Sequence, residues 1–259
     1  MNLQPETAWL IEVASGMSRN EQLSSRRRVD AETERRALHL AARRASGEPL
    51  QYVTGTAAFR HLELSVGPGV FIPRPETELV AERAMELLPH GGALVDVGTG
   101  SGAIALAVAY ERADARVLAT ESSGEALAYA QRNADRLKLS VELFSGDLLD
   151  ALPATWKGSL DVCVSNPPYV PVGDRIGLPG DVVDHEPHVA LFSEDDGLGT
   201  IRKLAAAARD WVRPGGRLVL EVGDRQGAAV RGILEERGYQ DIAIGRDMTG
   251  RQRIAEARV

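Results

Sequence analysis

The spacing of apolar residues changes along the chain, and the first 50 residues follow a helical period. Residues 7–14 form a short amphipathic stretch. Asp30 stands where it can cap a longer helix over 31–46, whose polar faces carry glutamate and arginine. Glycine and proline follow at once. The sequence therefore predicts a small helical N-terminal domain over residues 1–50.

A segment with strand-like alternation comes next. Apolar and polar residues alternate over 50–55 and again over 62–66, and Gly55 and Gly67 are turn signals. We expect a β-hairpin within residues 51–70 that links two domains.

Two prolines stiffen residues 71–78. Pro75 suits the first turn of a helix that runs to about residue 88, and the helix dipole favours Glu76 and Glu78 in that turn. The structural interpretation is the start of a helix. The functional interpretation is a rigid lip over a ligand.

From residue 93 onward, short apolar strands alternate with amphipathic helices. Strands are predicted over 93–97, 116–120, 141–144, 161–165, 217–222, 241–244 and 253–257. Helices are predicted over 102–111, 123–137, 198–212 and 226–237. This alternation is typical of the α/β class, so residues 71–259 are expected to form a doubly wound, seven-stranded, mostly parallel, Rossmann-like sheet.

The composition of the chain limits the kinds of partner and the cellular location that can be expected. The 259 residues include 30 basic and 37 acidic side chains, and this balance argues against a broad nucleic-acid-binding face. The lone cysteine, Cys163, lies in an apolar strand and is interpreted as a small buried hydrophobe. No apolar run is long enough to span a membrane, and residues 1–16 do not resemble a signal peptide, so a cytoplasmic protein is expected. The arginine run at 26–28 is either a solvated face or a contact for something anionic.

A glycine-rich loop joins the strand over 93–97 to its helix. Gly98, Gly100 and Gly102 alternate with Thr99 and Ser101, and glycines at such a turn let a ligand approach the backbone closely. A dinucleotide site must be considered, but the third glycine is not where that fingerprint requires it.

Three carboxylates accompany this loop. Asp96 precedes it and would repel a pyrophosphate, but it can hydrogen-bond the ammonium group of a methionine moiety, directly or through water. Glu121 ends the next strand, where an acid accepts from two ribose hydroxyls. Asp147 follows the third strand and can accept from an adenine amino group. The simpler interpretation of Glu121 or Asp147 alone is a strand-end cap, but the three acids together predict the cationic nucleoside S-adenosyl-L-methionine.

The segment Asn166-Pro167-Pro168-Tyr169 ends the strand over 161–165. The prolines fix the backbone, so an amide side chain, a free carbonyl and an aromatic ring are held at the carboxyl end of a strand. The simpler interpretation is a stiff turn with a packing tyrosine. Beside a methyl donor, the Asn166 oxygen and the Pro167 carbonyl can each accept one N–H from a planar, weakly nucleophilic NH2 group. Tyr169 would pack on the flat target near the sulfonium, and positioning would supply the rate.

These motifs together resemble the bacterial peptide chain release factor glutamine methyltransferases, a branch of the class I S-adenosylmethionine-dependent methyltransferases. The match spans nearly the whole chain. It rests on residues 47–52, 72–78, 96–106, 166–169, 186–187, 190–191, 197–198 and 226–227. The proline-arginine-proline form of the lip is similar to the release factor branch and not to the related ribosomal protein branch.

The resemblance implies N5-methylation of the glutamine in the Gly-Gly-Gln motif of release factors, with the helical N-terminal domain helping to hold that partner. It implies that residues 98–102, Glu121 and Asn166 contact the donor, and that residues 166–169 contact the glutamine. Two positions depart from the family pattern. Glu121 stands where aspartate is usual, and Leu148 stands where many members have an aromatic residue beside the adenine.

Other functions have less support in the sequence. Residues 185–188 include two histidines and a glutamate, but nothing else supplies a matching metal-ligand set. Methylation of an exocyclic amino group on a nucleic acid base uses similar chemistry, but it would require a basic tracking surface. A different glutamine, as in a ribosomal protein, and a non-catalytic module that keeps the fold are the remaining alternatives.

Overall fold

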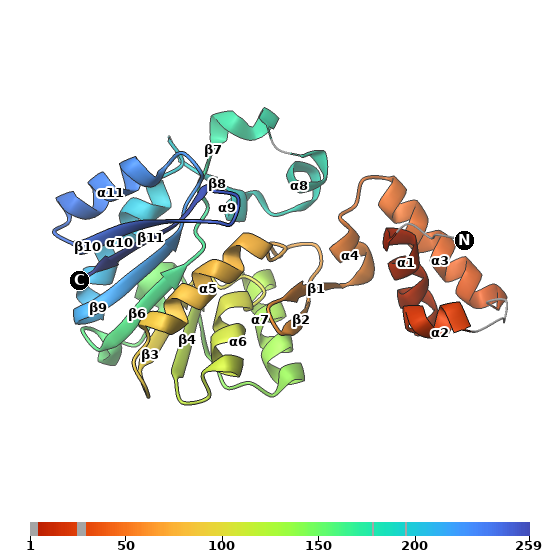
Figure 1. Ribbon diagram of the computed structural model, residues 1–259, viewed down its shortest axis with the longest axis horizontal. Coiled ribbons are helices and arrows are strands. Elements are labelled where there is room, and N and C mark those ends of the chain that lie inside the picture. Colours follow the sequence, from red (N-terminus) through yellow and green to blue (C-terminus); the bar gives the residue numbers. More distant parts are fainter. Residues whose placement is uncertain (1–4, 25–29, 178, 195) are drawn as a thin grey trace.

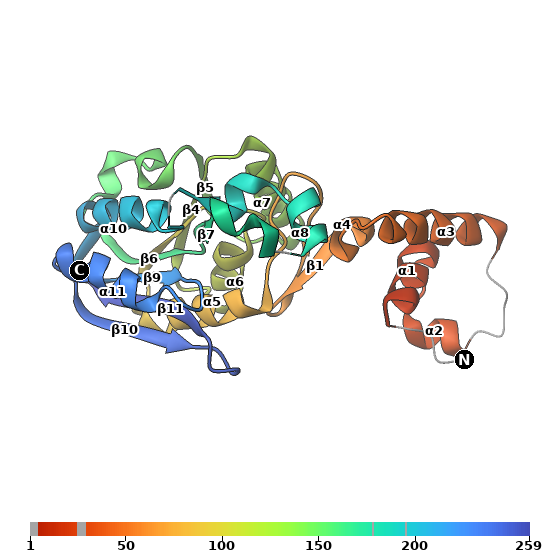
Figure 2. The ribbon, with the colours of Figure 1, turned by 90° about the horizontal axis from the view of Figure 1, so that it is seen from above.

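The computed structural model describes residues 5–24, 30–177, 179–194 and 196–259. A group of N-terminal helices lies to one side of an α/β body, and α4 (Leu50–Thr54) connects the two (Figures 1 and 2). The arginine run at 26–28 lies outside the described residues.

The N-terminal part contains the two predicted helices and one short helix that was not predicted. They are α1 (Pro5–Ser15), α2 (Arg19–Ser24) and α3 (Ala31–Ala45). The Asp30 carboxylate accepts a hydrogen bond from the Thr33 backbone N–H at 2.7 Å, which confirms the predicted cap of α3. Ala8, Leu10 and Ala14 of α1 are buried, and α1 packs on α3.

The prediction of a strand over 50–55 is wrong. These residues form the short helix α4, which buries the side chains of Tyr52 and Val53. Gly55 adopts φ 80° and ends the helix, and its N–H donates to the Gln51 carbonyl at 2.8 Å. The Tyr52 hydroxyl donates to the Val70 carbonyl at 2.6 Å, so a contact 18 positions away secures the helix.

The predicted hairpin is present but begins later. Strands β1 (Thr56–Phe59) and β2 (Leu62–Ser65) pair antiparallel, with Thr56 opposite Ser65. The side chains of Ala57, Phe59, Leu62 and Leu64 are buried, so the hairpin packs one face against the α/β body.

The α/β body contains the expected seven-stranded sheet, in the order β10-β11-β9-β6-β3-β4-β5. Its strands are β3 (Ala93–Val97), β4 (Arg116–Glu121), β5 (Glu142–Ser145), β6 (Leu160–Ser165), β9 (Val212–Glu221), β10 (Gln240–Arg246) and β11 (Gln252–Arg258). Strand β11 runs antiparallel to both of its neighbours, and the other pairs are parallel. The mostly parallel, doubly wound fold class is confirmed.

Helices cover both faces of the sheet. They are α5 (Pro75–Leu87), α6 (Ala103–Glu111), α7 (Gly124–Leu137), α10 (Gly199–Trp211) and α11 (Gly227–Glu236). Helices α5 and α6 share one hydrophobic core with Leu94, whereas α10 and α11 share the other with Val95. Adjacent residues of β3 thus face opposite cores, as the strand pleat requires. Cys163 is fully buried, as predicted.

The described residues of 166–198 form an irregular insert between β6 and α10. It contains β7 (Val170–Pro171), α8 (Gly180–His185), α9 (His188–Leu191) and β8 (Phe192–Ser193), and it rises above the carboxyl edge of the sheet (Figure 1). Within the described residues, no helix combines the length and the apolar character that a membrane crossing needs.

Candidate active site

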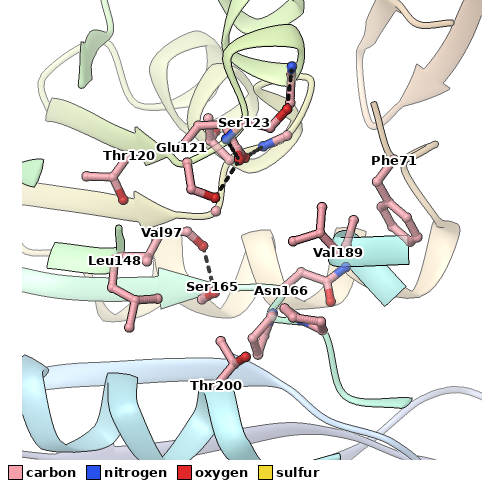
Figure 3. Close-up of a pocket in the computed structure, with 18 of the residues that line it drawn as sticks. Phe71, Val97, Thr120, Glu121, Ser123, Leu148, Ser165, Asn166, Val189 and Thr200 are labelled. Carbon is pink, nitrogen blue, oxygen red and sulfur yellow. Dashed lines mark hydrogen bonds between the residues drawn. The ribbon is translucent and has the colours of Figure 1, made fainter. Parts of the chain in front are cut away.

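A cavity of about 290 Å³ opens at the carboxyl ends of β3, β4, β5 and β6. The predicted residues that line it are Asp96, Gly98, Thr99, Gly100, Ser101, Glu121, Asp147, Leu148, Asn166, Pro167 and Pro168. Leu148 lies toward one end of the cavity, Phe71 and Val189 lie at the other, and Glu121 and Asn166 lie between them (Figure 3). Motifs from four strands therefore converge on one site, as open α/β sheets favour.

Two predicted residues do not line the cavity. Gly102 begins α6 with φ 87°, and a Cβ there would approach Leu106 Cδ1 to 2.8 Å, so this glycine permits close packing inside the protein. Tyr169 is absent from the cavity lining, and its hydroxyl donates to Glu221 at the end of β9.

The glycine loop presents bare backbone to the cavity. Gly98 and Gly100 have φ values of 71° and 59°, and a Cβ at either position would meet no atom within 4 Å. The N–H groups of Gly98 and Thr99 both donate to the Thr120 carbonyl, at 2.9 and 3.0 Å, which anchors the loop to β4. The absent side chains leave room for a ligand against the loop.

Asp96 is almost completely buried at the base of this loop. Its Oδ2 accepts hydrogen bonds from the Thr99 hydroxyl at 2.6 Å and from the Ala105 N–H at 3.1 Å. Burial raises the pKa of the Asp96 carboxyl to about 7, against the lowering effect of those two bonds. The carboxylate thus supports the loop and also borders the cavity.

Glu121 links the loop to the next helix. Its Oε2 accepts from the Gly100 N–H at 2.9 Å, and its Oε1 accepts from the Ser123 N–H at 2.9 Å at the start of α7 (Figure 3). The carboxylate is therefore held in one orientation at the cavity wall.

Two buried hydroxyls in the cavity wall lack partners. Within the described residues, Ser101 Oγ and Thr120 Oγ1 make no hydrogen bond, although both residues line the cavity. Buried polar atoms without partners are costly, so this wall suits a ligand with polar groups. Leu148 also borders the cavity and adopts φ 46°, a conformation that is rare for a branched residue.

A chain of hydrogen bonds holds Asn166. Its Nδ2 donates to the Thr77 hydroxyl oxygen at 3.1 Å, and the Thr77 hydroxyl donates to Glu221 Oε2 at 2.6 Å. The Tyr169 hydroxyl donates to Glu221 Oε1 at 3.0 Å. Because the Nδ2 of Asn166 is engaged by Thr77, its Oδ1 is the atom left to accept from a ligand.

Sequence reasoning missed two contributors to this site, Glu221 and Val189. Glu221, which connects Thr77 to Tyr169, is an acid at the end of an apolar strand, and that placement was the available signal. Phe71 and Val189 add apolar surface at the mouth, and Val189 is 67% exposed.

The predicted lip borders the cavity through Phe71, Pro73 and Thr77. The Arg74 guanidinium pairs with the buried Glu186 carboxylate of the insert and lies 4.7 Å from the centroid of the Phe71 ring. Glu186 Oε2 also accepts from the Ile72 N–H at 3.1 Å. Among the described residues, no cluster of His, Cys, Asp and Glu could hold a metal ion, and the motif at 185–188 uses its glutamate for this clamp.

This sheet, with its antiparallel final strand and glycine-lined cavity, has the fold of an α/β methyltransferase. Residues 64–176 match the family model described as a methyltransferase small domain. A solved methyltransferase from Pyrococcus furiosus has the same fold, with a TM-score of 0.59 and 22% identity over 87% of this chain and 98% of that one.

The chain belongs to the release factor glutamine methyltransferases. It is 47% identical to the member from Streptomyces coelicolor, over 88% of this chain and 82% of the relative. It is 38% identical to the member from Geobacter sulfurreducens, over 100% of this chain and 90% of the relative. Residues 4–55 match the model of the PrmC N-terminal domain. The resemblance inferred from the sequence motifs is confirmed.

Proposed function

We propose that this protein transfers a methyl group from S-adenosyl-L-methionine to the side-chain amide nitrogen, N5, of the glutamine in the Gly-Gly-Gln motif of release factors. The observation that carries the proposal is the contact of 3.1 Å from Asn166 Nδ2 to the Thr77 hydroxyl, because it leaves Oδ1 free to accept from an NH2 group. The names of relatives 38–47% identical to the chain support the choice of a release factor as the substrate.

The walls of the cavity suit the donor. Gly98, Thr99, Gly100 and Ser101 would hold its methionine part beside Asp96, Glu121 would accept from its ribose, and Asp147 and Leu148 would border its adenine. Asp96, Glu121 and Asp147 line the cavity together, which favours a positively charged ligand. When bound, S-adenosyl-L-methionine supplies an electrophilic methyl group on a cationic sulfur. The unpartnered hydroxyls of Ser101 and Thr120 suit the polar edge of such a ligand.

The residues of the loop after β6 would orient the acceptor. Asn166 Oδ1 and the Pro167 carbonyl would each accept one N–H of the glutamine amide, which directs the nitrogen lone pair toward the donor. Phe71, Pro168 and Val189 would enclose the apolar stem of the side chain. Tyr169 would act at the edge of this site, with its hydroxyl fixed by Glu221. No general base is required before transfer, because the nitrogen becomes acidic only once it carries the methyl group.

The chain divides into three parts under this proposal. We assign residues 1–50 to a helical domain that helps hold the release factor, 51–70 to a linker and 71–259 to the catalytic domain. A release factor substrate implies a cytoplasmic enzyme. The net charge of -7 supports the absence of direct nucleic acid binding.

Labelled S-adenosyl-L-methionine tests the proposal directly. The enzyme is incubated with a release factor, with the same factor carrying Gln→Ala in its Gly-Gly-Gln motif, and with DNA. We expect label on the unaltered factor alone. Equal labelling of the Gln→Ala factor would place the methyl group elsewhere, and label on DNA alone would favour the base-methylating alternative.

A further inference from the structure

Glu221 is a buried carboxylate that touches neither proposed ligand directly. It ends β9, its residue is 1% exposed, and it faces the first turn of α5 and the loop after β6. Its two oxygens receive one hydroxyl each, from Thr77 at 2.6 Å and from Tyr169 at 3.0 Å. A buried acid with two engaged oxygens beside an active site requires an explanation, because burial of a charge is costly.

The Glu221 carboxylate fixes the direction of the hydrogen bonds that lead to Asn166. An ionised carboxylate only accepts, so the Thr77 hydroxyl must give its single proton to Glu221. The Thr77 oxygen then offers only lone pairs to Asn166. Of the two ends of the Asn166 amide, only the NH2 group can approach those lone pairs, and the contact from Nδ2 at 3.1 Å has this orientation.

We propose that ionised Glu221 is the positioning residue that, through Thr77, keeps the Asn166 carbonyl oxygen directed at the acceptor amide. This inference rests on the proposed function, because the amide acceptor is part of it. A protonated Glu221 would donate to the Thr77 oxygen and release the Thr77 proton. That proton would attract Asn166 Oδ1, and the reversed amide would present an NH2 group to the NH2 of the substrate.

The charges around Glu221 give this device a pH dependence. The pKa of the Glu221 carboxyl is raised above its usual value, chiefly by burial and also by the negative charge of Glu76 on α5. The hydrogen bonds from Thr77 and Tyr169 and the positive charge of Arg253 on β11 act in the opposite direction and lower it. The productive amide orientation is present above this pKa. This orientation is lost as the pH falls through the pKa of Glu221, so kcat at saturating donor has an acid limb that belongs to Glu221.

The test compares Glu221→Gln, Thr77→Val and the matched control Thr77→Ser. A glutamine accepts from one of the two hydroxyls and donates to the other, so it no longer fixes the direction of the Thr77 proton. Valine interrupts the chain, whereas serine preserves the hydroxyl. We expect kcat for the release factor to fall about 10–100-fold in Glu221→Gln and in Thr77→Val. Donor affinity, measured by calorimetry, should stay within about two-fold of the wild-type value, because neither side chain is assigned to the donor.

Three further readouts separate positioning from general stability. Thr77→Ser should retain most of the wild-type kcat, and the double variant Glu221→Gln/Thr77→Val should be no slower than the slower single variant. The kcat of Glu221→Gln, measured at saturating donor so that the titration of Asp96 does not contribute, should lack the acid limb. In the free enzyme, the Asn166 side-chain NH2 resonances should be protected from exchange in the wild type and lose that protection in Thr77→Val. Thermal melting verifies folding.

The outcomes distinguish the two proposals. If the wild-type enzyme fails to label the release factor, the proposed function fails. If the wild type labels the factor and Thr77→Val retains its kcat and its Asn166 protection, the positioning role of Glu221 is overturned and the proposed function stands. The comparison of Thr77→Val with Thr77→Ser tests the positioning role even if Glu221→Gln does not fold.

Discussion

Arg74 of the lip and Glu186 of the insert, 112 positions apart in the chain, form an ion pair beside the mouth of the cavity. The Glu186 side chain is 1% exposed and the Arg74 side chain is 29% exposed. Arg74 also lies over the Phe71 ring, which borders the cavity. The stiffness expected from the two lip prolines is thus supplemented by a clamp from a distant segment.

Arg74→Ala should destabilise the protein, because the buried Glu186 carboxylate loses its cation. We expect the free energy of unfolding to fall by about 1–3 kcal/mol, less than for a fully buried pair since Arg74 is partly solvated. Urea denaturation measures this. Arg35→Ala is the matched control, because the Arg35–Glu32 pair is exposed, and its effect should stay below about 0.5 kcal/mol. Adding Glu186→Gln to Arg74→Ala should recover part of the loss, and no recovery would contradict this account of the clamp.

Removal of the Asn166 side chain should separate binding from turnover. In Asn166→Ala the acceptor amide loses one of its two oxygen partners, so kcat should fall by about 100–1000-fold. Donor affinity should change little, because the glycine loop and Glu121 remain. Rapid-quench turnover and calorimetry measure the two quantities. A variant with near-normal turnover would remove Asn166 from the mechanism.

A methyl group on the glycine loop should obstruct the donor. Gly98→Ala and the matched control Gly158→Ala place alanine at similar φ values, 71° and 66°, with no atom within 4 Å of the new Cβ in either case. Each should cost about 1–2 kcal/mol of stability from backbone strain. Only Gly98 borders the cavity, so only Gly98→Ala should weaken donor binding, on the order of ten-fold. Equal donor affinities in the two variants would show that the donor does not lie against this loop.

Donor binding should tighten with rising pH because of Asp96. Its pKa of about 7 means that the free protein holds a proton there in mildly acid solution. A cationic ammonium favours the ionised form, so binding releases that proton. Affinity should therefore rise as the pH increases from about 5.5 to 7 and level off above the pKa of Asp96. Calorimetry in buffers of different ionisation enthalpy measures the released proton. Asp96→Asn should remove the pH dependence, and its persistence in that variant would assign the effect to another group.

The sequence by itself predicted the structural features that depend on nearby residues. The Asp30 cap, the strand and glycine loop over 93–102 and the strand that ends just before Asn166 depend on neighbours a few positions away, and all take the predicted form. The parallel sheet follows from the alternation of strands with helices, because right-handed crossovers leave few other arrangements. The convergence of Asp96, Glu121 and Asp147 on one cavity follows in turn, since parallel strands end at the same edge.

Tertiary structure alone decided features that depend on distant contacts. Residues 50–54 alternate like a strand, but the bond from Tyr52 to Val70 and the left-handed Gly55 favour a helix. The link from Thr77 to Glu221 joins residues 144 positions apart, and it exists only because α5 packs against β9. No local pattern encodes such a contact. Residue types and periodicity specified which chemistry the chain carries, whereas the packing of helices on the sheet specified which hydrogen bonds aim that chemistry at a substrate.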